Sequence, residues 1–245
     1  MSSKIVKKIK KQLKYIARRI IQKKIIVIHD VMLNIRHQSI NKNLRHHFYK
    51  GTYEGEELKV LKQVLTSSDK IIEIGAGIGF LSTFCAKSIG DANVVAYEAN
   101  PQMIPKIKET YALNGINPAI HNIILSDRDG ESDFYLEPEF WASSMIKISD
   151  QSKLVKVKTK NINSAITDNK TNFLIIDIEG GEKFLIPLID FSNITKLLIE
   201  LHPNILGDNA ISIIIQDLLS KGFMLDVLKS YKNVFYFYKK NTLDL

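Results

Sequence analysis

From about residue 69 onward, short apolar segments alternate with segments of helical periodicity, and this alternation constrains the fold more than any other feature. A chain that repeats strand and helix in this way forms a parallel sheet with helices on both faces. The segments expected to be strands of this sheet are 70–74, 93–98, 119–125, 172–178 and 196–201. Helices are expected over 80–89, 101–113, 181–190 and 208–221. The sequence therefore predicts an α/β fold.

Further segments complete this prediction. Residues 132–136 and 154–158 alternate charged and apolar side chains, which is typical of edge strands. Residues 223–228 and 234–238 are expected to form a closing hairpin, which would make the last strand antiparallel. Asn100 is the expected N-cap of the helix over 101–113, because asparagine is favoured at that position. Pro101, which follows it, suits the first position of a helix.

Basic residues are concentrated at the start of the chain. Residues 1–50 contain 14 Lys and Arg and one acid, whereas residues 51–245 contain 20 Lys and Arg and 25 acids. We therefore expect a basic amphipathic helical extension over 1–50 and a mildly acidic main domain over 51–245. In the extension, an apolar stripe recurs every three or four residues, at Ile5, Ile9, Leu13, Ile16 and Ile20.

Three interpretations of the extension stay open. Residues 1–30 could lie on an anionic membrane surface, bind nucleic acid, or pack their stripe on the main domain or on a partner. Lys23 and Lys24 interrupt the apolar run, so the segment is a poor signal peptide. The uninterrupted apolar run is also too short to span a bilayer. Cys85 is the only cysteine, which excludes a disulfide within the chain and fits a reducing compartment. We expect a cytoplasmic protein that could be peripheral at the inner membrane surface.

The loop after the first expected strand has glycine at alternate positions, Gly75, Gly77 and Gly79. In a doubly wound sheet such a loop borders the ligand crevice, and glycine lets the backbone approach the ligand closely. A dinucleotide site would need its third glycine where Phe80 stands, and a P-loop would need Gly-Lys-Ser/Thr, so the spacing disfavours both. Glu98 closes the second expected strand, where a carboxylate can accept both hydroxyls of an adenosine ribose.

Four segments, taken in order, resemble the FkbM-type methyltransferases: GTYEGEEL, IIEIGAGIGFLS, YEANPQMIPKIKETYALNGI and FLIIDIEGGEKFLIPLID. The resemblance covers about residues 50–240, and its most specific part is DIEGGE at 177–182 followed by IELHP at 199–203. It implies S-adenosylmethionine as cofactor and a Rossmann-like class I methyltransferase fold. That fold has a seven-stranded, mostly parallel sheet with a C-terminal antiparallel hairpin, and residues 51–245 would be the methyltransferase domain.

The resemblance also implies which residues hold the cofactor. They are, in chain order, Glu54, Glu73, Gly75, Ala76, Gly77, Glu98, Ala99, Ser126 and Asp127. The glycine loop would line the methionine part with Glu73 at the ammonium group, and Glu98 would accept the ribose hydroxyls. Ser126 and Asp127 would flank the adenine edge. The family usually has Asp where this chain has Glu73, and Pro where it has Ala99.

Methyl transfer requires an aligned acceptor and a group that removes a proton as charge develops. The DIEGGE segment stands where methyltransferases that act on base amino groups often carry Asn/Asp-Pro-Pro-aromatic, which favours an oxygen acceptor. Asp177 is the expected general base, and Glu179 and His202 are further catalytic candidates. A divalent ion held by these side chains is an alternative that we do not favour. The residues expected at the acceptor are Trp141, Ser143 and Glu200.

Simpler structural roles stay open for several of these residues. Glu179 and Glu182 could only cap a helix N-terminus, His202 could be a turn residue, and Trp141 could plug its own loop. The sequence predicts an S-adenosylmethionine-dependent O-methyltransferase acting on a hydroxyl of a glycan, a glycolipid head group or a related small molecule. The alternatives are a glycan- or membrane-associated binding module without turnover, an RNA methyltransferase and a nucleotide-dependent oxidoreductase. Nucleic acid is not an expected partner.

Overall fold

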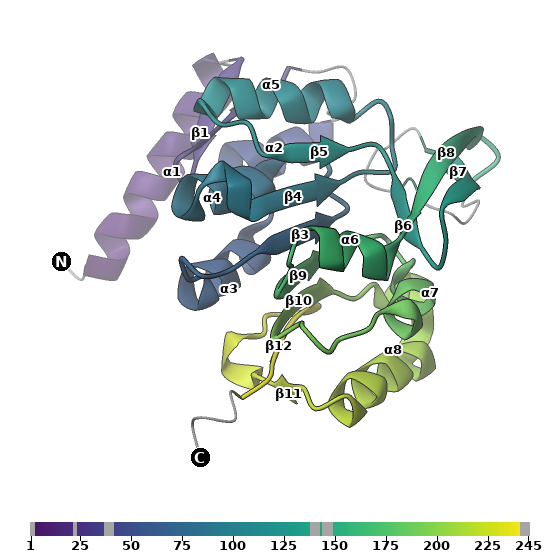
Figure 1. The fold of residues 1–245 in the computed structure, drawn as a ribbon. Helices are drawn as coiled ribbons and strands as arrows, with labels where there is room; N and C mark the ends of the chain where they lie inside the picture. The colour runs from purple at the N-terminus through teal and green to yellow at the C-terminus, as the bar shows by residue number, and fades with distance from the viewer. Residues whose placement is uncertain (1–2, 22–23, 37–41, 138–142, 144–148, 241–245) are drawn as a thin grey trace.

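A seven-stranded sheet forms the centre of the computed structural model, in the order β11-β12-β10-β9-β3-β4-β5 (Figure 1). Its strands are β3 (Ile71–Ile74), β4 (Val94–Tyr97), β5 (Ala119–His121), β9 (Phe173–Ile176), β10 (Lys196–Glu200), β11 (Met224–Leu225) and β12 (Val234–Tyr238). The strands from β10 to β5 are parallel, and β12 is antiparallel to β10 and β11. The structure describes residues 3–21, 24–36, 42–137, 143 and 149–240. The predicted α/β fold, with its mostly parallel sheet and closing hairpin, is confirmed.

The central strands are buried on both faces, which explains why their sequences are almost continuously apolar. Successive side chains point to opposite faces, so Ile71 belongs to one core cluster with Phe80 and Ile107, whereas Ile72 belongs to another with Ile162 and Leu218. The helices that contribute to the first of these clusters are α2 (Lys42–Lys50), α3 (Gly55–Val64), α4 (Phe80–Ile89) and α5 (Ile104–Asn114). Those that contribute to the second are α6 (Ile162–Asp168), α7 (Glu182–Leu185) and α8 (Pro203–Ser220).

The strand order reverses beside β3. The chain runs from β3 to β4 and β5 on one side, then returns to β9 and β10 on the other. Ligands of open α/β sheets bind beyond the carboxyl ends of the strands at such a switch point. The loops that begin there contain Gly75 after β3, Glu98 after β4 and Asp177 after β9. The topology therefore brings these three predicted residues to one edge of the sheet.

The N-terminal part contains α1 (Ser3–Ile21), β1 (Ile25–Ile28), β2 (Val31–Asn34) and α2 (Lys42–Lys50). β1 and β2 form an antiparallel hairpin, and its buried residues Ile26, Val31 and Leu33 join the cluster that contains α4 and α5. Asn114 at the end of α5 exchanges two hydrogen bonds of 2.9 Å with the backbone of Met32. The predicted helical extension is therefore wrong for residues 25–34, because alternating apolar residues pack one face of a hairpin on the body. The domain boundary near residue 50 stays a prediction.

The predicted third strand, 119–125, is divided between two sheets. β5 ends the main sheet, whereas β6 (Ile124–Ser126) pairs with β8 (Lys153–Asn161), which also pairs with β7 (Gly130–Leu136). The segments predicted as edge strands therefore belong to a separate three-stranded sheet. Asn122 lies at the break, and its side-chain amide donates to the carbonyl oxygens of Glu98 and Ala99. These bonds hold the chain where it leaves the main sheet.

The helix after β4 begins later than predicted. α5 starts at Ile104, and Asn100 does not cap it. Instead, the Asn100 side-chain oxygen accepts the N–H of Gln102, and its backbone oxygen accepts the N–H of Met103. Residues 100–103 therefore form a turn that precedes the helix.

Two other helices differ from their predicted bounds. The segment predicted at 181–190 is α7 followed by the 3₁₀ turn η3 (Ile186–Leu188), and α8 begins at Pro203 with a break at Gly207. The other 3₁₀ turns within the described ranges are η1 (Asp91–Asn93) and η4 (Val227–Lys229). Among the helices in the described ranges, none has the length and apolar character needed to cross a membrane.

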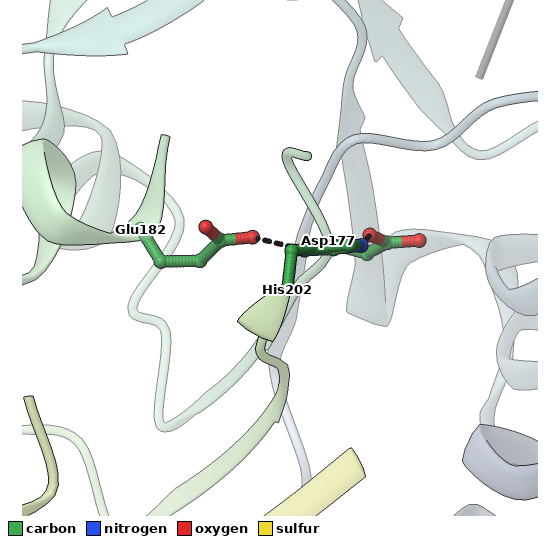
Figure 2. Close-up of side chains that lie close together, drawn as sticks. All are labelled: Asp177, Glu182 and His202. Atoms are coloured by element: carbon green, nitrogen blue, oxygen red, sulfur yellow. Dashed lines mark hydrogen bonds and ion pairs between the residues drawn. The ribbon is translucent and has the colours of Figure 1, made fainter. Parts of the chain in front are cut away.

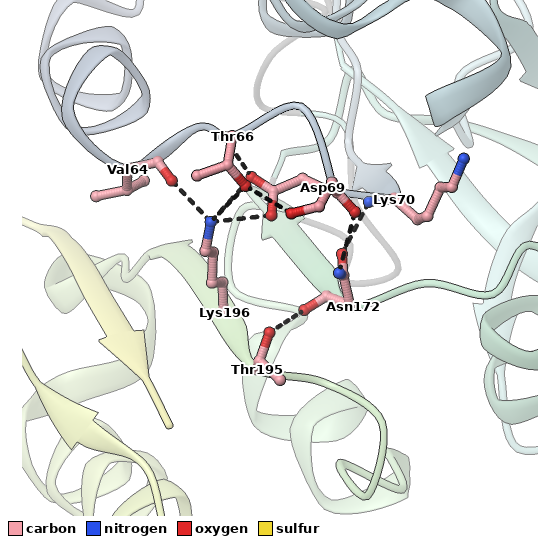
Figure 3. A network of polar contacts seen from close by, with 8 residues as sticks. Val64, Thr66, Asp69, Lys70, Asn172, Thr195 and Lys196 are labelled. Carbon is pink, nitrogen blue, oxygen red and sulfur yellow. Dashed lines mark hydrogen bonds and ion pairs between the residues drawn. The ribbon is translucent and has the colours of Figure 1, made fainter. Parts of the chain in front are cut away.

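A polar network joins the amino ends of β3, β9 and β10, away from the loops at the switch point (Figure 3). Lys196 Nζ donates to both carboxylate oxygens of Asp69 at 2.9 and 3.0 Å, and to the Val64 carbonyl at 2.8 Å. The Asn172 side-chain oxygen accepts the N–H of Lys70 at 2.8 Å. Asp69 is only 2% exposed, so its charge depends on Lys196.

Candidate functional site

A cleft opens at the carboxyl ends of β3, β4 and β9, with an empty volume of about 1070 Å³. This volume includes space that is open to solvent. The predicted site residues that line it are Glu54, Gly75, Gly77, Glu98, Ala99, Ser126, Ser143, Asp177 and Glu179. Glu73 and Ala76 line a smaller adjoining cavity. Trp141, which was predicted at the acceptor, lies outside the described residues.

The glycine loop forms a tight turn against β4. The N–H groups of Gly75 and Ala76 donate to the carbonyl oxygen of Tyr97 at 2.9 and 3.3 Å. Gly75, Gly77 and Gly79 have φ values of 90°, 56° and 76°, a region that glycine adopts without strain. Because Gly75 and Gly77 carry no side chain, their backbone itself borders the cleft.

Glu98 connects the glycine loop to the end of β4. Its Oε2 accepts the N–H of Gly77 at 2.8 Å, and its Oε1 accepts the N–H of Asn100 at 2.7 Å. Burial raises the pKa of Glu98 to about 7, although these backbone N–H groups oppose the rise. Each carboxylate oxygen can accept more than one hydrogen bond, so Glu98 keeps acceptor sites for hydroxyl groups in the cleft.

Glu73 is buried at the end of β3, beside the adjoining cavity. Its Oε2 has no hydrogen-bond partner among the described residues. Burial raises the pKa of Glu73 to about 8, partly offset by hydrogen bonds from Ser82. An unpartnered buried carboxylate oxygen is costly, so this side chain is suited to a cationic group.

The wall opposite the glycine loop comes from β6 and from the segment after β7. Ala99 and Ser126 line the cleft, whereas Asp127 is exposed and accepts a hydrogen bond from the Ser126 hydroxyl at 2.9 Å. Ser143 is buried and lines the cleft, and its oxygen accepts the N–H of Glu137 at 3.0 Å. Of the predicted Ser126–Asp127 pair, the structure therefore brings Ser126 to the cleft.

Three acids surround His202, which precedes α8, and Figure 2 shows two of them, Asp177 and Glu182. Its Nδ1 lies 2.9 Å from Oε1 of Glu182, a fully buried side chain at the start of α7. Its Nε2 lies 3.3 Å from Oε2 of Glu179 and 3.5 Å from Oδ1 of Asp177. His202 thus links α7 to two carboxylates that line the cleft.

The protonation of this cluster is shifted by burial and by its own charges. Burial disfavours the imidazolium, but the hydrogen bond to Glu182 and the charges of Glu179 and Asp177 outweigh it and raise the pKa of His202 to about 9. Burial raises the pKa of Asp177 well above its usual range, and the charges of Glu200 and Glu179 add to the rise. Burial also raises the pKa of Glu179 to about 7. Carboxyl groups with raised pKa values beside a cleft are candidate proton acceptors.

The same cluster has the donors of a metal site. Asp177, Glu182 and His202 each offer one ligand atom, and these atoms lie within 4.8 Å of one another. Carboxylate oxygens and imidazole nitrogen suit divalent transition metals. In the structure, Glu182 and His202 use two of these atoms to pair with each other.

A second acidic group lies at the end of β10. Glu200, predicted at the acceptor, lies beside Glu57 of α3 and outside the cleft lining, and a hydrogen bond joins the two carboxyl groups. Burial raises the pKa of Glu57 to about 7. Glu54 lines both the cleft and the adjoining cavity, and burial together with the charge of Glu57 raises its pKa well above the usual range.

Sequence reasoning missed two residues of this region. Phe184 of α7 lines the cleft and is 50% exposed, although an aromatic residue in a helical pattern is typical of a core. Glu57 belongs to the GTYEGEEL segment, but nothing in its spacing indicates that it meets Glu200. Only the fold shows that the Phe184 side chain is exposed and that Glu57 is paired with Glu200.

The residues at the cleft fit S-adenosylmethionine. Its ribose carries two hydroxyl donors, for which Glu98 offers acceptor sites. Its ammonium group is cationic, and Glu73 brings a buried carboxylate oxygen that lacks a hydrogen-bond partner in the described structure. The side chains that would hold the cofactor therefore match its charge and its hydrogen-bond donors.

Comparison with known proteins agrees with this assignment. The methyltransferase FkbM domain matches residues 73–234. The ribosomal protein L11 methyltransferase of Lactococcus lactis subsp. cremoris is 27% identical over 143 residues, which are 56% of this chain and 45% of the relative. That of Thermotoga neapolitana is 25% identical over 115 residues, 46% of this chain and 43% of the relative. The chain spans less than half the length of these curated relatives.

Solved structures resemble the chain more distantly. Ribosomal protein L11 methylase from Lactobacillus delbrueckii subsp. bulgaricus is 15% identical with a TM-score of 0.45, covering 78% of this chain and 80% of that one. TYW2 of M. jannaschii in complex with AdoMet is 15% identical with a TM-score of 0.44, covering 88% and 86%.

The family match begins at Glu73 and ends at Val234, so it takes in all three loops at the switch point and most of the sheet around them. The resemblance seen in the sequence is thereby confirmed. The chain belongs to the FkbM methyltransferase family, whose cofactor is S-adenosylmethionine.

Proposed function

We propose that the protein transfers a methyl group from S-adenosylmethionine to a hydroxyl of a glycan, a glycolipid head group or a related small molecule. One observation carries the proposal. Asp177 lines the cleft, and its Oδ1, which has no hydrogen-bond partner in the described ranges, is buried 3.5 Å from His202 Nε2. A hydroxyl is a weak nucleophile, so an acceptor of this kind requires a base at such a position.

Asp177 has the properties of that base. Glu98 and Glu73 would hold S-adenosylmethionine, which supplies the methyl group. The acceptor oxygen would take the methyl group in place of the sulfur of the bound cofactor, and its proton would pass to Asp177. The raised pKa of Asp177 makes its carboxylate a stronger proton acceptor than an exposed aspartate. Glu182 holds His202 in position, and the imidazolium limits the repulsion between Asp177 and Glu179.

The cleft wall supports a saccharide as acceptor. Phe184 is half exposed and lines the cleft, as Asp177 and Glu179 do. An aromatic ring can pack against the apolar C–H face of a sugar. The carboxylates disfavour a polyanionic RNA, because their charge would repel its phosphates.

A protein amino group is the second candidate acceptor. The acidic cleft would attract a cationic amine, and Asp177 or Glu179 could take its proton before transfer. Matched relatives are named for the methylation of ribosomal protein L11 and of protein lysine. This candidate differs from the first only in the atom that is methylated.

An assay with radioactive methyl donor separates these outcomes. The purified chain is incubated with cell extract fractionated into glycans, glycolipids, protein and RNA, and the labelled product is hydrolysed. An O-methyl sugar supports the proposal, whereas a methylated amino acid or nucleoside contradicts it. Tight binding of S-adenosylhomocysteine without transfer to any fraction indicates a binding module that lacks turnover.

A further inference from the structure

The described apolar residues along one side of α1 are exposed to solvent. Val6, Ile9, Leu13 and Ile16 recur at helical spacing and are 40%, 44%, 60% and 43% exposed. An amphipathic helix of a globular protein normally buries this stripe on the core. In α1, the described apolar side chains of the stripe remain available to a partner.

The opposite side of α1 attaches it to the body. Tyr15 Oη lies 3.1 Å from His46 Nδ1, and Arg18 Nη1 donates to the Tyr49 carbonyl at 3.1 Å. Tyr15 follows Leu13 by two residues and Arg18 follows Ile16 by two, which is about 200° around an α-helix. The anchoring side chains and the stripe therefore lie on opposite sides of the helix, so the attachment holds the stripe outward.

The charge of α1 indicates what covers the stripe. Its sequence has eight Lys and Arg and no acid, and Lys8 and Lys10 are exposed close to the stripe. The next element, β1, adds the exposed side chains of Ile25 and Val27. An anionic lipid surface satisfies both features, because its head groups attract the lysines while its acyl boundary takes up the apolar side chains.

We propose that α1 is a docking surface for an anionic lipid bilayer, with Val6, Ile9, Leu13 and Ile16 inserted at the interface. A second copy of this chain would bring two strongly basic helices together, which their charges oppose. Nucleic acid would neutralise the lysines but leave the apolar stripe in water. The surface does not rest on the acceptor chemistry, because α1 contributes no residue to the cleft lining.

Vesicle flotation of the full chain tests the proposal. We expect binding to phosphatidylcholine vesicles that contain phosphatidylglycerol, weaker binding at high salt, and little binding to phosphatidylcholine alone. The double variant Ile9→Gln, Leu13→Gln should lower partitioning onto the anionic vesicles by at least about tenfold. The matched control Ile213→Gln, Leu219→Gln changes two exposed apolar residues of α8 and should bind like the wild type.

Further measurements keep the outcomes distinct. Thermal unfolding and S-adenosylhomocysteine affinity of the α1 variant should equal those of the wild type, because neither side chain touches the cleft. Wild-type partitioning by the α1 variant overturns the proposal, as does a wild type that binds no vesicle. Light scattering in the absence of vesicles tests for a second copy instead. If the wild type is a dimer and the α1 variant is a monomer, the stripe is assigned to a second copy of the chain. The helix is assigned to nucleic acid if two results are found together. The wild type binds no vesicles, and the α1 variant binds RNA as strongly as the wild type does.

Discussion

Gly75 lies so close to Asp177 that an ideal Cβ atom on the glycine would be 1.7 Å from the aspartate carbonyl oxygen. The contact joins the loop after β3 to the end of β9, across the strand pair where the order of the sheet reverses. The glycine is therefore required by its neighbour on β9 as well as by the cleft. It places the Asp177 backbone at a fixed distance from the loop that borders the cofactor.

Gly75→Ala should lower the free energy of unfolding by at least about 2 kcal/mol, because backbone would have to move and φ is +90°. Gly115→Ala is the matched control, since Gly115 also has positive φ but nothing within 4 Å of the added atom. Urea unfolding of both variants measures the difference. Equal losses would show that the contact with Asp177 carries no cost beyond backbone strain.

Glu98→Gln should weaken S-adenosylhomocysteine binding about tenfold or more at pH 8, because the ribose hydroxyls lose a charged acceptor. In the wild type, affinity should rise from pH 6 to pH 8 as Glu98, with its pKa of about 7, becomes ionised. Calorimetry across this range should give a flatter profile for the variant. Glu131→Gln, an exposed change on β7, should leave both affinity and profile unaltered.

Asp177→Asn should reduce turnover by at least about 100-fold, because it removes the proton acceptor while keeping the shape of the side chain. Affinity for S-adenosylhomocysteine should stay within about threefold, since Glu98 and Glu73 are unchanged. Single-turnover methyl transfer and calorimetry measure the two quantities. Full turnover by the variant would assign the base to another group of the cluster, with Glu179 the nearest candidate.

Glu182→Gln should lower the pKa of His202 from about 9 towards its ordinary value, because the hydrogen bond loses its charged acceptor. An NMR titration of the imidazole follows the change, with His202→Gln to assign the resonance. A raised histidine pKa stabilises the fold fully below about pH 6.5 and loses this contribution as pH rises through about 9. The fall in the free energy of unfolding over that interval should be shallower in Glu182→Gln, and an unchanged histidine titration would contradict the assignment.

Lys196→Met should lower the free energy of unfolding by about 3 kcal/mol, because Asp69 would keep a buried charge without its partner. Cofactor affinity should not change, since this network lies at the amino ends of the strands. Lys156→Met removes the exposed ion pair with Asp133 and should lower the free energy of unfolding much less, because solvent screens that pair. Similar losses in the two variants, measured by urea unfolding, would mean that the buried pair is no stronger than the exposed one.

Features that depend on a few neighbouring residues could be predicted from the sequence. The central strands are apolar apart from Glu73 in β3, and the alternate glycines allow the turn after β3 that the structure shows. Glu98 follows its strand directly, so its place at the sheet edge follows from the strand itself. Local hydrophobic periodicity and glycine conformation are sufficient for these features, because they act within one turn or one strand.

Contacts between distant segments were decided by the tertiary structure. Residues 25–34 were predicted as part of a helical extension. In the structure they form a hairpin, one face of which packs on α4 and α5. Asn122 divides a predicted strand because it bonds to Glu98 and Ala99. The pairing of His202 with Glu182, and the outward direction of the α1 stripe, likewise depend on side chains distant in sequence. Periodicity determines which side chains share a face of an element, but only packing of the whole chain decides what that face meets.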